Sequence, residues 1–389
     1  MVKQLKVGML GYAFMGRAHS NAYNQIPKFF PDIGVEPVKE VVCGRSEEPL
    51  QEMASQFGWN RTETDWEKLM TSYDLDIFDN CGPNNFHLEP NIAAAEAGID
   101  IVCEKPLART LAEAKQMAEV VKKTGVKTMV AFNYRRVPAV QLAKKLIEDG
   151  FIGRIFHWRA VYLQDWIIDP EFPLVWRLQK DKAGSGPHGD LNAHIIDLAR
   201  YLVGEIDQVI GMEETFIKER PLPGGEGGEL GAQKSAKTDM GTVDVDDAVL
   251  FLAKFASGAL GSFEATRFAN GRRNFNSFEI NGSKGSVVFN LERMNELQVY
   301  SSEDPEYAQG FRRVLVTEPS HKYANRWWPS GHIIGWEHTF THELADFLEA
   351  IAKETPVMPD FQDAVKTQAV LEKVKDSIGS KSWERLPEL

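Results

Sequence analysis

The first 133 residues alternate short apolar runs with amphipathic stretches, and this alternation restricts the possible folds more than any other feature of the chain. Short apolar strands separated by helices are typical of a parallel sheet that has helices on both faces. The sequence therefore predicts a doubly wound α/β domain over residues 1–133. Its expected strands are 3–11, 38–43, 75–81, 99–103 and 127–132, and helices are expected up to residue 26 and over 88–97 and 111–123.

A glycine-rich turn separates the first expected strand from the first helix. Gly11 and Gly16 occupy the first and third glycine positions of a G-x-G-x-x-G pattern, and Ala13 stands at the second. In the dinucleotide-binding form of this turn, the glycines allow a tight turn, close approach to a pyrophosphate and close packing of the helix. Alanine is the smallest departure from that pattern. Dinucleotide contacts are therefore predicted at Gly11, Ala13, Phe14, Met15 and Gly16.

The second expected strand ends in Gly44, Arg45 and Ser46, without an acidic residue. NAD-binding domains usually carry an Asp or Glu near this point to hold the ribose hydroxyls, whereas an arginine accommodates the 2′-phosphate of NADP. Arg45 and Ser46 are thus candidates to bind that phosphate. The alternative is that Arg45 is an ordinary surface arginine. The predicted cofactor is NAD or NADP, and Arg45 suggests that NADP is accepted.

Polar residues also follow the remaining expected strands. Ligands of open α/β sheets bind at the carboxyl ends of the strands, so these residues are expected to line the same cofactor. The predicted contacts are Pro83, Asn84 and His87 after the third strand, Glu104 and Lys105 after the fourth, and Asn133 after the fifth.

Residues 184–202 combine helix signals with ionisable side chains. Ser185 is suited to cap a helix and Pro187 to occupy its first position. Apolar residues then recur every three or four positions, beside a stripe that contains Asp190, His194 and Asp197. Unpaired charges are costly to bury. Asp190 and His194 therefore form either a structural pair that helps the helix to dock or part of a functional site, and the rest of the chain favours the site.

The chain beyond residue 134 is predicted to be α+β with a mostly antiparallel sheet. Strand patterns separated by hairpin turns dominate it after the helix of residues 184–202. The stretch 218–242 is rich in Gly and Pro and is predicted to be a mobile loop. Strands are expected at 154–163, 209–216, 248–255, 259–267, 276–281, 286–290, 297–300 and 312–316, and helices at 138–149, 337–353 and 361–377.

Composition narrows the classes of partner and location. The net charge of −12 and the lack of a basic run argue against nucleic-acid binding, and no apolar run is long enough to span a bilayer. The three cysteines suggest buried free thiols, and a strand starts almost at residue 1, so we expect a cytoplasmic protein without a signal peptide. His338 and His342 have metal-ligand spacing, but no Cys or acid pair completes a set, so no metal is predicted.

Taken together, these motifs resemble the Gfo/Idh/MocA family of sugar and inositol dehydrogenases. The motifs that carry the resemblance are the glycine turn, Pro83-Asn84 with His87, Glu104-Lys105-Pro106, residues 133–135, and the G-D-x-x-x-H-x-x-D pattern that starts at Gly189. The resemblance implies a Rossmann domain over residues 1–133, followed by a substrate-binding α+β domain over 134–389 with a large open-faced sheet. It also implies homodimers or homotetramers that pair through that sheet.

The resemblance further implies that Lys105 and His194 bond the reacting hydroxyl, while Asp190 holds an adjacent one. A lysine acts as a base near neutral pH only if its surroundings lower its pKa. Lys105 could otherwise contact a phosphate or face water, and the tryptophans could pack beneath the sheet. The expected substrate-binding residues are Lys105, Tyr134, Arg135, Gln164, Trp166, Trp176, Arg177, Asp190, His194 and His332.

Residues 131–136, 162–166 and 243–247 resemble those of glycoside 3-dehydrogenases within the family. The predicted activity is oxidation of a secondary hydroxyl, at C3, of a pyranose, anhydrosugar or glycoside by hydride transfer to nicotinamide. Two alternatives stay open: a redox-neutral NAD-dependent glycosidase, and a catalytically silent sugar sensor. The presence of Lys105, Asp190 and His194 together argues against the sensor. Pro187 and His188 depart from the small or aliphatic residues usual in the family.

Overall fold

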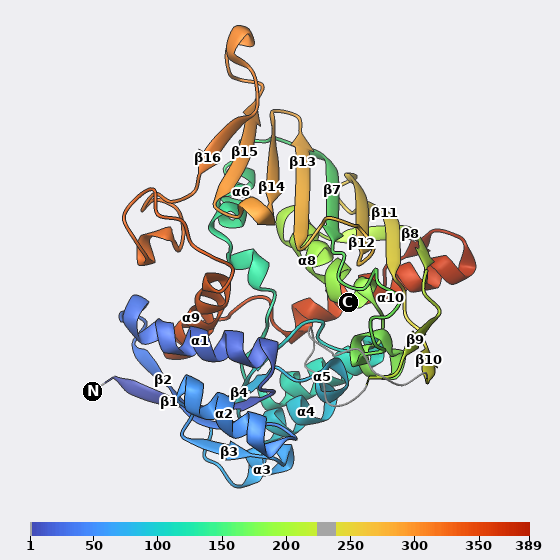
Figure 1. Cartoon of the computed structure of the whole chain (residues 1–389). Coiled ribbons are helices and arrows are strands. Elements are labelled where there is room, and N and C mark those ends of the chain that lie inside the picture. The colour runs from blue at the N-terminus through green and yellow to red at the C-terminus, as the bar shows by residue number, and fades with distance from the viewer. Residues whose placement is uncertain (1, 224–238) are drawn as a thin grey trace. The chain divides into compact units, whose positions relative to one another are not determined.

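The computed structural model describes residues 2–223 and 239–389, which form two compact units (Figure 1). Unit 1 comprises the described residues up to 133 together with 336–368, and unit 2 comprises the other described residues. The first unit therefore includes a segment that the sequence assigned to the second domain. Side chains link this segment to unit 1: Thr341 donates to Gln25 at 3.0 Å, and Asn133 donates to Thr339 at 2.8 Å.

Unit 1 contains a parallel sheet with the strand order β3-β2-β1-β4-β5-β6. Helix α1 packs against α2 and α9, and α4 packs against α3 and α5. The predicted doubly wound sheet is confirmed. Its strands are β1 (Lys3–Leu10), β2 (Val35–Cys43), β3 (Arg61–Glu63), β4 (Ile77–Asn80), β5 (Asp100–Cys103) and β6 (Thr128–Val130). Its helices are α1 (Phe14–Phe29), α2 (Glu47–Phe57), α3 (Trp66–Thr71), α4 (Leu88–Glu96), α5 (Leu111–Thr124) and α9 (His338–Ala352).

Local sequence sets the ends of several of these helices. Helix α5 begins after Thr110, whose side chain accepts the backbone N–H of Glu113, and it ends at Gly125 with a φ of 77°. A polar cap at the start and a left-handed glycine at the end satisfy backbone groups that the helix leaves unpaired. Because all strands of this sheet are parallel, their carboxyl ends lie along the same edge.

Unit 2 contains a sheet of nine strands with the order β16-β15-β14-β13-β7-β12-β11-β8-β17. Only the pair β12 and β7 is parallel among its described pairings, so the predicted mostly antiparallel sheet is confirmed. The strands are β7 (Ile155–Leu163), β8 (Ile206–Glu214), β11 (Ala248–Phe255), β12 (Leu260–Thr266), β13 (Phe275–Gly282), β14 (Gly285–Asn290), β15 (Glu296–Ser301), β16 (Arg312–Leu315) and β17 (Glu384–Arg385).

The stretch predicted as a loop contains two short paired strands, β9 (Glu219–Pro221) and β10 (Met240–Thr242). The loop prediction was wrong for these ends, because backbone pairing between them was not visible in the composition. Residues 224–238 lie outside the described part of the chain. The helices of unit 2 are α6 (Pro138–Glu148), α7 (Lys180–Ala183) and α8 (Ala193–Leu202), and α10 (Phe361–Ser380) runs from unit 1 into unit 2.

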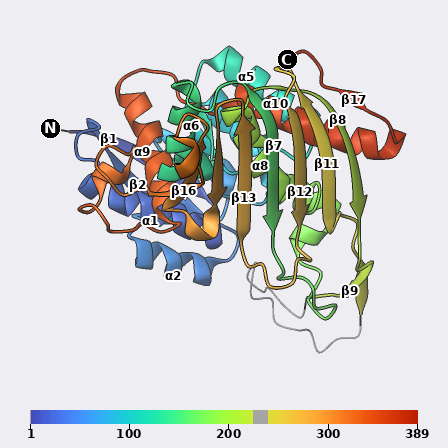
Figure 2. The same ribbon diagram turned by 90° about the horizontal axis from the view of Figure 1, so that it is seen from above.

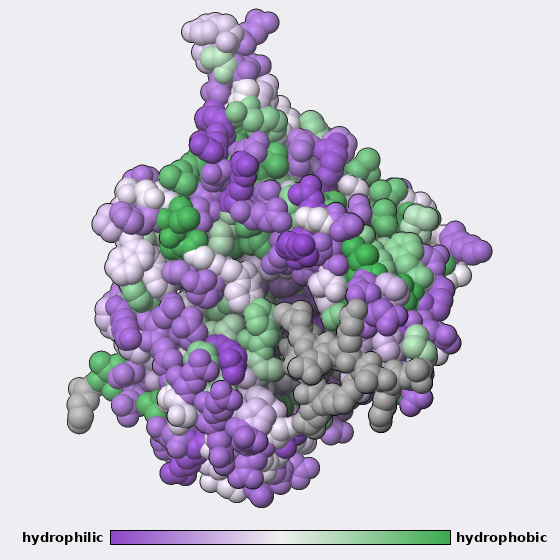
Figure 3. Space-filling model, in the orientation of Figure 1, coloured by the Kyte–Doolittle hydropathy of each residue, from purple (hydrophilic) through white to green (hydrophobic). Residues whose placement is uncertain are grey.

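One face of the nine-stranded sheet packs against α8, and Figure 2 looks onto the opposite face. Along β11 the side chains alternate, with Phe251 buried while Leu250 and Leu252 are 41% and 52% exposed. Met212 and Leu260 on the neighbouring strands are also exposed, and Figure 3 shows hydrophobic side chains gathered over β8, β11 and β12. A broad apolar surface of this kind is typical of an interaction site.

The described helices include none long and apolar enough to cross a membrane.

Candidate active site

The glycine turn of unit 1 is packed so closely that two of its positions exclude any side chain. Gly11 has a φ of 102°, and a Cβ there would lie 2.6 Å from the carbonyl oxygen of Cys81. A Cβ on Gly16 would overlap the carbonyl group of Gly11. Ala13, directly before α1, is exposed, so its methyl group is accommodated. The turn therefore has the tight geometry and free helix N-terminus that a pyrophosphate requires.

The aromatic residue of this turn stacks on a residue from much later in the chain. The rings of Phe14 and Trp336 lie 5.3 Å apart and nearly parallel, at 9°. Trp336 also meets Phe340 of α9 edge-on, at 4.6 Å. Phe14 remains 43% exposed. Met15, its neighbour, is half-buried at the first turn of α1.

The Tyr12 ring fills the space beside Gly44, at the end of β2. A Cβ on Gly44 would overlap the ring of Tyr12, so residue 44 has no room for a carboxylate side chain while Tyr12 keeps its place. Arg45 is exposed, and Ser46 directly precedes α2. Arg45 and Ser46 are thus polar residues at this strand end that could contact a ribose or its phosphate.

His87 contacts backbone carbonyls on two neighbouring loops. Its Nδ1 lies 3.0 Å from the oxygen of Pro106, and its Nε2 lies 3.1 Å from the oxygen of Gly82. Burial lowers the pKa of His87. The imidazole therefore ties the loop after β4 to the loop after β5, while Pro83 and Asn84 stay partly exposed beside it.

Four buried side chains form a carboxylate–histidine cluster that sequence reasoning missed: His19, Tyr23, Asp79 and Glu104. His19 Nδ1 lies 2.9 Å from Asp79 Oδ2, and His19 Nε2 lies 3.1 Å from Glu104 Oε1. The Tyr23 hydroxyl donates to Asp79 at 3.0 Å. Burial acts to lower the pKa of His19, but Asp79 and Cys81 together outweigh this effect, and the pKa lies well above its usual range.

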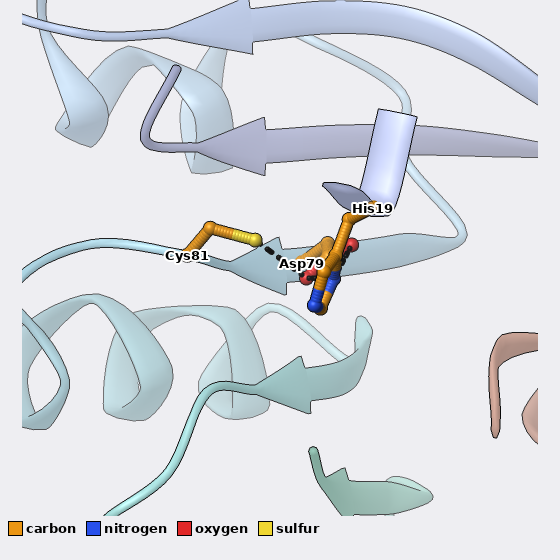
Figure 4. Close-up of side chains that lie close together, drawn as sticks. All are labelled: His19, Asp79 and Cys81. Carbon is orange, nitrogen blue, oxygen red and sulfur yellow. Dashed lines mark hydrogen bonds and ion pairs between the residues drawn. The ribbon is translucent and has the colours of Figure 1, made fainter. Parts of the chain in front are cut away.

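The same cluster touches Cys81, as Figure 4 shows. The Cys81 thiol lies 3.4 Å from Asp79 Oδ1, and ligand atoms of His19, Asp79 and Cys81 lie within 4.8 Å of one another. Such a group could hold a metal ion. Both ring nitrogens of His19 are hydrogen-bonded to carboxylates, however, and burial raises the pKa of the Cys81 thiol well above its usual range. We therefore assign these residues to hydrogen bonding.

Lys105 lies just after β5, next to Glu104 of the carboxylate–histidine cluster, and its side chain is half-buried. Its backbone N–H donates to Glu104 Oε2 at 3.0 Å. At the next strand end, Asn133 is buried and bonded to Thr339.

In unit 2, α8 is preceded by a π-helical turn over His188–Asn192. Helical backbone begins at Pro187, as predicted, but its first turn is π-helical and Ser185 does not cap it. The Asp246 carboxylate instead accepts the backbone N–H groups of Gly186 at 2.9 Å and His188 at 2.8 Å. The His188 ring is buried and its Nε2 lies 2.8 Å from the Leu371 carbonyl oxygen. π-Turns within helices are frequent at functional sites.

Asp190 lies within this turn and pairs with Arg267. The Arg267 guanidinium donates to Asp190 Oδ2 at 2.6 Å. The arginine side chain is 1% exposed and the aspartate side chain 24%. A buried cation thus fixes a carboxylate that a ligand can still reach, and no sequence pattern had indicated this partner.

His194, one turn further on, lies beside two tyrosines. Its ring is 4.5 Å from that of Tyr134 and 5.8 Å from that of Tyr162. The two tyrosine hydroxyls lie 2.9 Å apart. The two tyrosine rings therefore pack against the His194 imidazole and hold it in place within unit 2.

Hydrogen bonds extend this group toward β7 and the loop that follows it. Asn274 accepts from the Tyr162 hydroxyl at 2.8 Å and from Gln164 at 3.0 Å. Trp166 donates to Gln164 at 2.8 Å, and the Arg267 guanidinium lies 5.1 Å from the Trp166 ring centre. Unit 2 thereby brings together five predicted substrate-binding residues: Tyr134, Gln164, Trp166, Asp190 and His194.

Other predicted substrate-binding residues have different surroundings. Arg135 forms a buried bidentate pair with Asp197, at 2.6 and 2.8 Å. Arg177 lies over the ring of its neighbour Trp176 at 4.3 Å. His332 is exposed, and its Nδ1 lies 2.8 Å from the Pro329 carbonyl oxygen. None of these contacts joins them to the group around His194 in the described part of unit 2.

The parallel sheet and the tight glycine turn define an NAD-binding oxidoreductase, as comparison with known families shows: residues 5–132 match the description "Oxidoreductase family, NAD-binding Rossmann fold". Residues 140–288 match the "GFO/IDH/MocA C-terminal domain". The chain belongs to the Gfo/Idh/MocA family.

Among its relatives is levoglucosan dehydrogenase of Pseudarthrobacter phenanthrenivorans, 46% identical over 389 residues that cover 100% of both chains. A structure of levoglucosan dehydrogenase with NADH and levoglucosan has a TM-score of 0.93 at 45% identity, and the match covers 100% of both chains. An oxidoreductase domain protein from Kribbella flavida is 49% identical with a TM-score of 0.93, covering 99% of this chain and 100% of the other.

Proposed function

We propose that the protein is an NAD(P)-dependent sugar dehydrogenase that oxidises a secondary hydroxyl, at C3, of a pyranose, anhydrosugar or glycoside. The observation that carries the proposal is the partly exposed Asp190 carboxylate, fixed by the buried Arg267 and close in sequence to His194. Carboxylate and imidazole groups on a rigid element suit the recognition of sugar hydroxyls. The likeness to levoglucosan dehydrogenase along the whole chain supports the substrate class.

The described residues of unit 1 fit a dinucleotide. The turn at Gly11, Ala13 and Gly16 would hold the pyrophosphate at the N-terminus of α1, where backbone N–H groups are available. When bound, the nicotinamide supplies the acceptor for the hydride of the substrate carbon. Phe14, Met15, Pro83, Asn84, Glu104 and Asn133 are proposed to line the cofactor, and His87 supports the loops beneath it.

Three side chains carry the remaining chemistry in this proposal. Lys105 takes the proton of the reacting hydroxyl, which must leave as the hydride departs. His194 donates a hydrogen bond to the same hydroxyl group, and Asp190 accepts one from an adjacent hydroxyl. Arg267 orients the Asp190 carboxylate.

The cofactor preference forms part of the proposal. An exposed Arg45 beside Ser46, next to a residue 44 that has no room for an acidic side chain, supports acceptance of NADP as well as NAD.

A substrate screen tests the function directly. Purified protein is mixed with pyranoses, anhydrosugars and alkyl glycosides, and with NAD or NADP, and the formation of reduced cofactor is followed. Stoichiometric NADH or NADPH with a ketosugar product is expected. Cleavage of a glycoside without net reduced cofactor would favour the redox-neutral glycosidase instead, and binding of sugar without any turnover would favour the sensor.

We also propose that the chain forms a homo-oligomer through the apolar face of the nine-stranded sheet. Exposed Leu250, Leu252 and Met212 on adjacent strands support this. Leu252→Asp should then lower the molar mass measured by light scattering, whereas an unchanged mass would contradict the proposal.

The cysteines support a cytoplasmic location. Cys43, Cys81 and Cys103 are all free thiols, as is usual in a reducing compartment.

A further inference from the structure

The two oxygens of the Glu104 carboxylate have different partners. Oε1 lies 3.1 Å from His19 Nε2, and Oε2 accepts the backbone N–H of Lys105 at 3.0 Å. His19 lies on α1, whereas Glu104 and Lys105 directly follow β5. A single carboxylate therefore links a helix of unit 1 to the backbone of the proposed catalytic lysine.

The hydrogen bonds around His19 require both ring nitrogens to donate. Each nitrogen faces an ionisable carboxylate, Asp79 on one side and Glu104 on the other. When both carboxylates are ionised neither can donate, and only the imidazolium, which has two N–H donors, then satisfies both contacts. The cation is fully buried, and Phe340 packs on it with ring centres 5.4 Å apart.

The titratable groups around His19 come from several elements. Asp79 and Cys81 approach from β4 and the residue after it, and Glu104 approaches from the end of β5. Tyr23 of α1 donates to the same Asp79. The pKa of Tyr23 is raised mainly by the burial of Tyr23 itself, and the buried Glu343 of α9 raises it further. The surroundings of His19 thus carry more negative than positive charge, which favours the imidazolium.

We propose that His19 is a positioning residue: as a buried cation it fixes the Glu104 carboxylate and, through it, the backbone from which Lys105 extends. The inference rests on the proposed role of Lys105 as the base. Misplacing a reacting group by about 1 Å can cost roughly a hundredfold in rate. Loss of the His19–Glu104 contact should therefore appear in kcat, with little effect on cofactor binding.

Two substitutions distinguish the two hydrogen bonds of the His19 ring, one to Asp79 and one to Glu104. An asparagine at position 19 can replace the donor at Nδ1, toward Asp79, whereas a glutamine can replace the donor at Nε2, toward Glu104. Both variants remove the same buried charge, so a purely structural role predicts similar losses of thermal stability and similar kcat values for the folded protein. We expect His19→Asn to lower kcat about 10- to 100-fold, and His19→Gln to keep kcat several-fold higher than His19→Asn. The Kd for NAD, measured by calorimetry, should stay within a few-fold for both.

Equal kcat values for the two folded variants would overturn the proposal. If His19→Asn does not fold, Glu104→Gln provides the second test. The amide oxygen of glutamine can accept from either His19 or Lys105, but its NH₂ group cannot accept from the other, so one of the two hydrogen bonds is lost. Glu104→Gln should then lose kcat by a similar factor, and a wild-type kcat would overturn the proposal.

A double variant separates this inference from the proposed function. His19→Asn in a Lys105→Ala background should add little further loss of kcat, because the lysine that it positions is gone. The full additional loss would mean that His19 acts through another group, which overturns the inference. A normal rate for Lys105→Ala alone would instead overturn the role of Lys105 in the proposed function.

Discussion

The carboxylate–histidine cluster of unit 1 and the Asp190–Arg267 pair of unit 2 are built alike but differ in access. In each, a buried cation holds a carboxylate. In unit 1 the side chains of His19 and Asp79 are both fully buried, whereas in unit 2 the Asp190 side chain is 24% exposed. The buried cation sets the geometry in both, but only the Asp190 carboxylate stays open to a ligand, whereas Glu104 bonds to the protein backbone.

The largest effect is expected where the unit 1 cluster ends, at Lys105. Lys105→Ala should lower kcat by roughly 10²–10⁴, the usual contribution of a positioned acid or base. The Kd for the cofactor should change only a few-fold, as measured by fluorescence titration. The exposed Lys123 of α5 provides the control, since Lys123→Ala should leave kcat unchanged. A parallel loss of cofactor binding in Lys105→Ala would make this lysine a phosphate or ribose contact.

The next effect concerns the accessible carboxylate of unit 2. Asp190→Asn should lower kcat/KM for the sugar about 100-fold, because the carboxylate is proposed to hold a substrate hydroxyl in the transition state. It should also cost about 1–3 kcal/mol of unfolding free energy, since the buried Arg267 loses a charged acceptor. Steady-state kinetics and thermal unfolding measure the two losses separately.

Glu205→Gln is the matched control for Asp190→Asn. Glu205 follows α8 and pairs at 2.9 Å with Arg200, whose side chain is 3% exposed. This variant should lose some stability and keep sugar turnover. If Asp190→Asn behaves in the same way, the Asp190–Arg267 pair is structural and the contrast between the two clusters fails.

A smaller effect is expected at Arg45, which is open to water. Arg45→Asp should weaken NADP binding by about 1.5–3 kcal/mol, the usual contribution of a charge-assisted hydrogen bond, and leave NAD binding nearly unchanged. Calorimetric titration with both cofactors measures this difference. A hundredfold preference of the unsubstituted protein for NAD would rule out a phosphate contact at Arg45.

The smallest effect separates two buried histidines of unit 1. Burial lowers the pKa of His87, so its stabilising contribution is complete above about pH 6.5 and falls as the pH drops through the folded-state pKa. The raised pKa of His19 gives the opposite sign: its contribution is complete below about pH 6.5 and falls as the pH rises through the folded-state value. Each site can change the unfolding free energy by up to about 1.4 kcal/mol per pH unit.

Urea unfolding between pH 5 and 9 measures both contributions. His87→Gln should flatten the acid side of the stability profile, and His19→Gln should flatten the alkaline side. Identical profiles for the two variants would show that the two histidines do not differ in charge.

The local motifs of unit 1 were predictable because their structural roles depend on residues that are close to them in the sequence. Gly11 and Gly16 bracket a strand-to-helix turn, and Glu104 and Lys105 directly follow an apolar run. His19 was missed because a histidine within an amphipathic helix carries no signal of its own. The available signal was Asp79, an acid inside an apolar strand, since a buried carboxylate needs a partner.

The partners in unit 2 could not be predicted in this way. Asp190 and Arg267 are 77 residues apart, and Asp246 bonds backbone groups 58 and 60 residues before it. No local pattern connects such positions. The π-turn was missed for the same reason, because it occurs where a remote carboxylate binds the amides of Gly186 and His188.

The contact between Tyr12 and Gly44 limits how cofactor preference can evolve in this protein. An acid at position 44 would suit NAD, but its Cβ would overlap the Tyr12 ring, so the substitution requires Tyr12 to shift or to become smaller. Shrinking Tyr12 first removes packing and brings no benefit. The two positions are therefore epistatic, and selection one step at a time meets a fitness valley at this strand end. The exposed Arg45 and Ser46 offer the accessible mutational route.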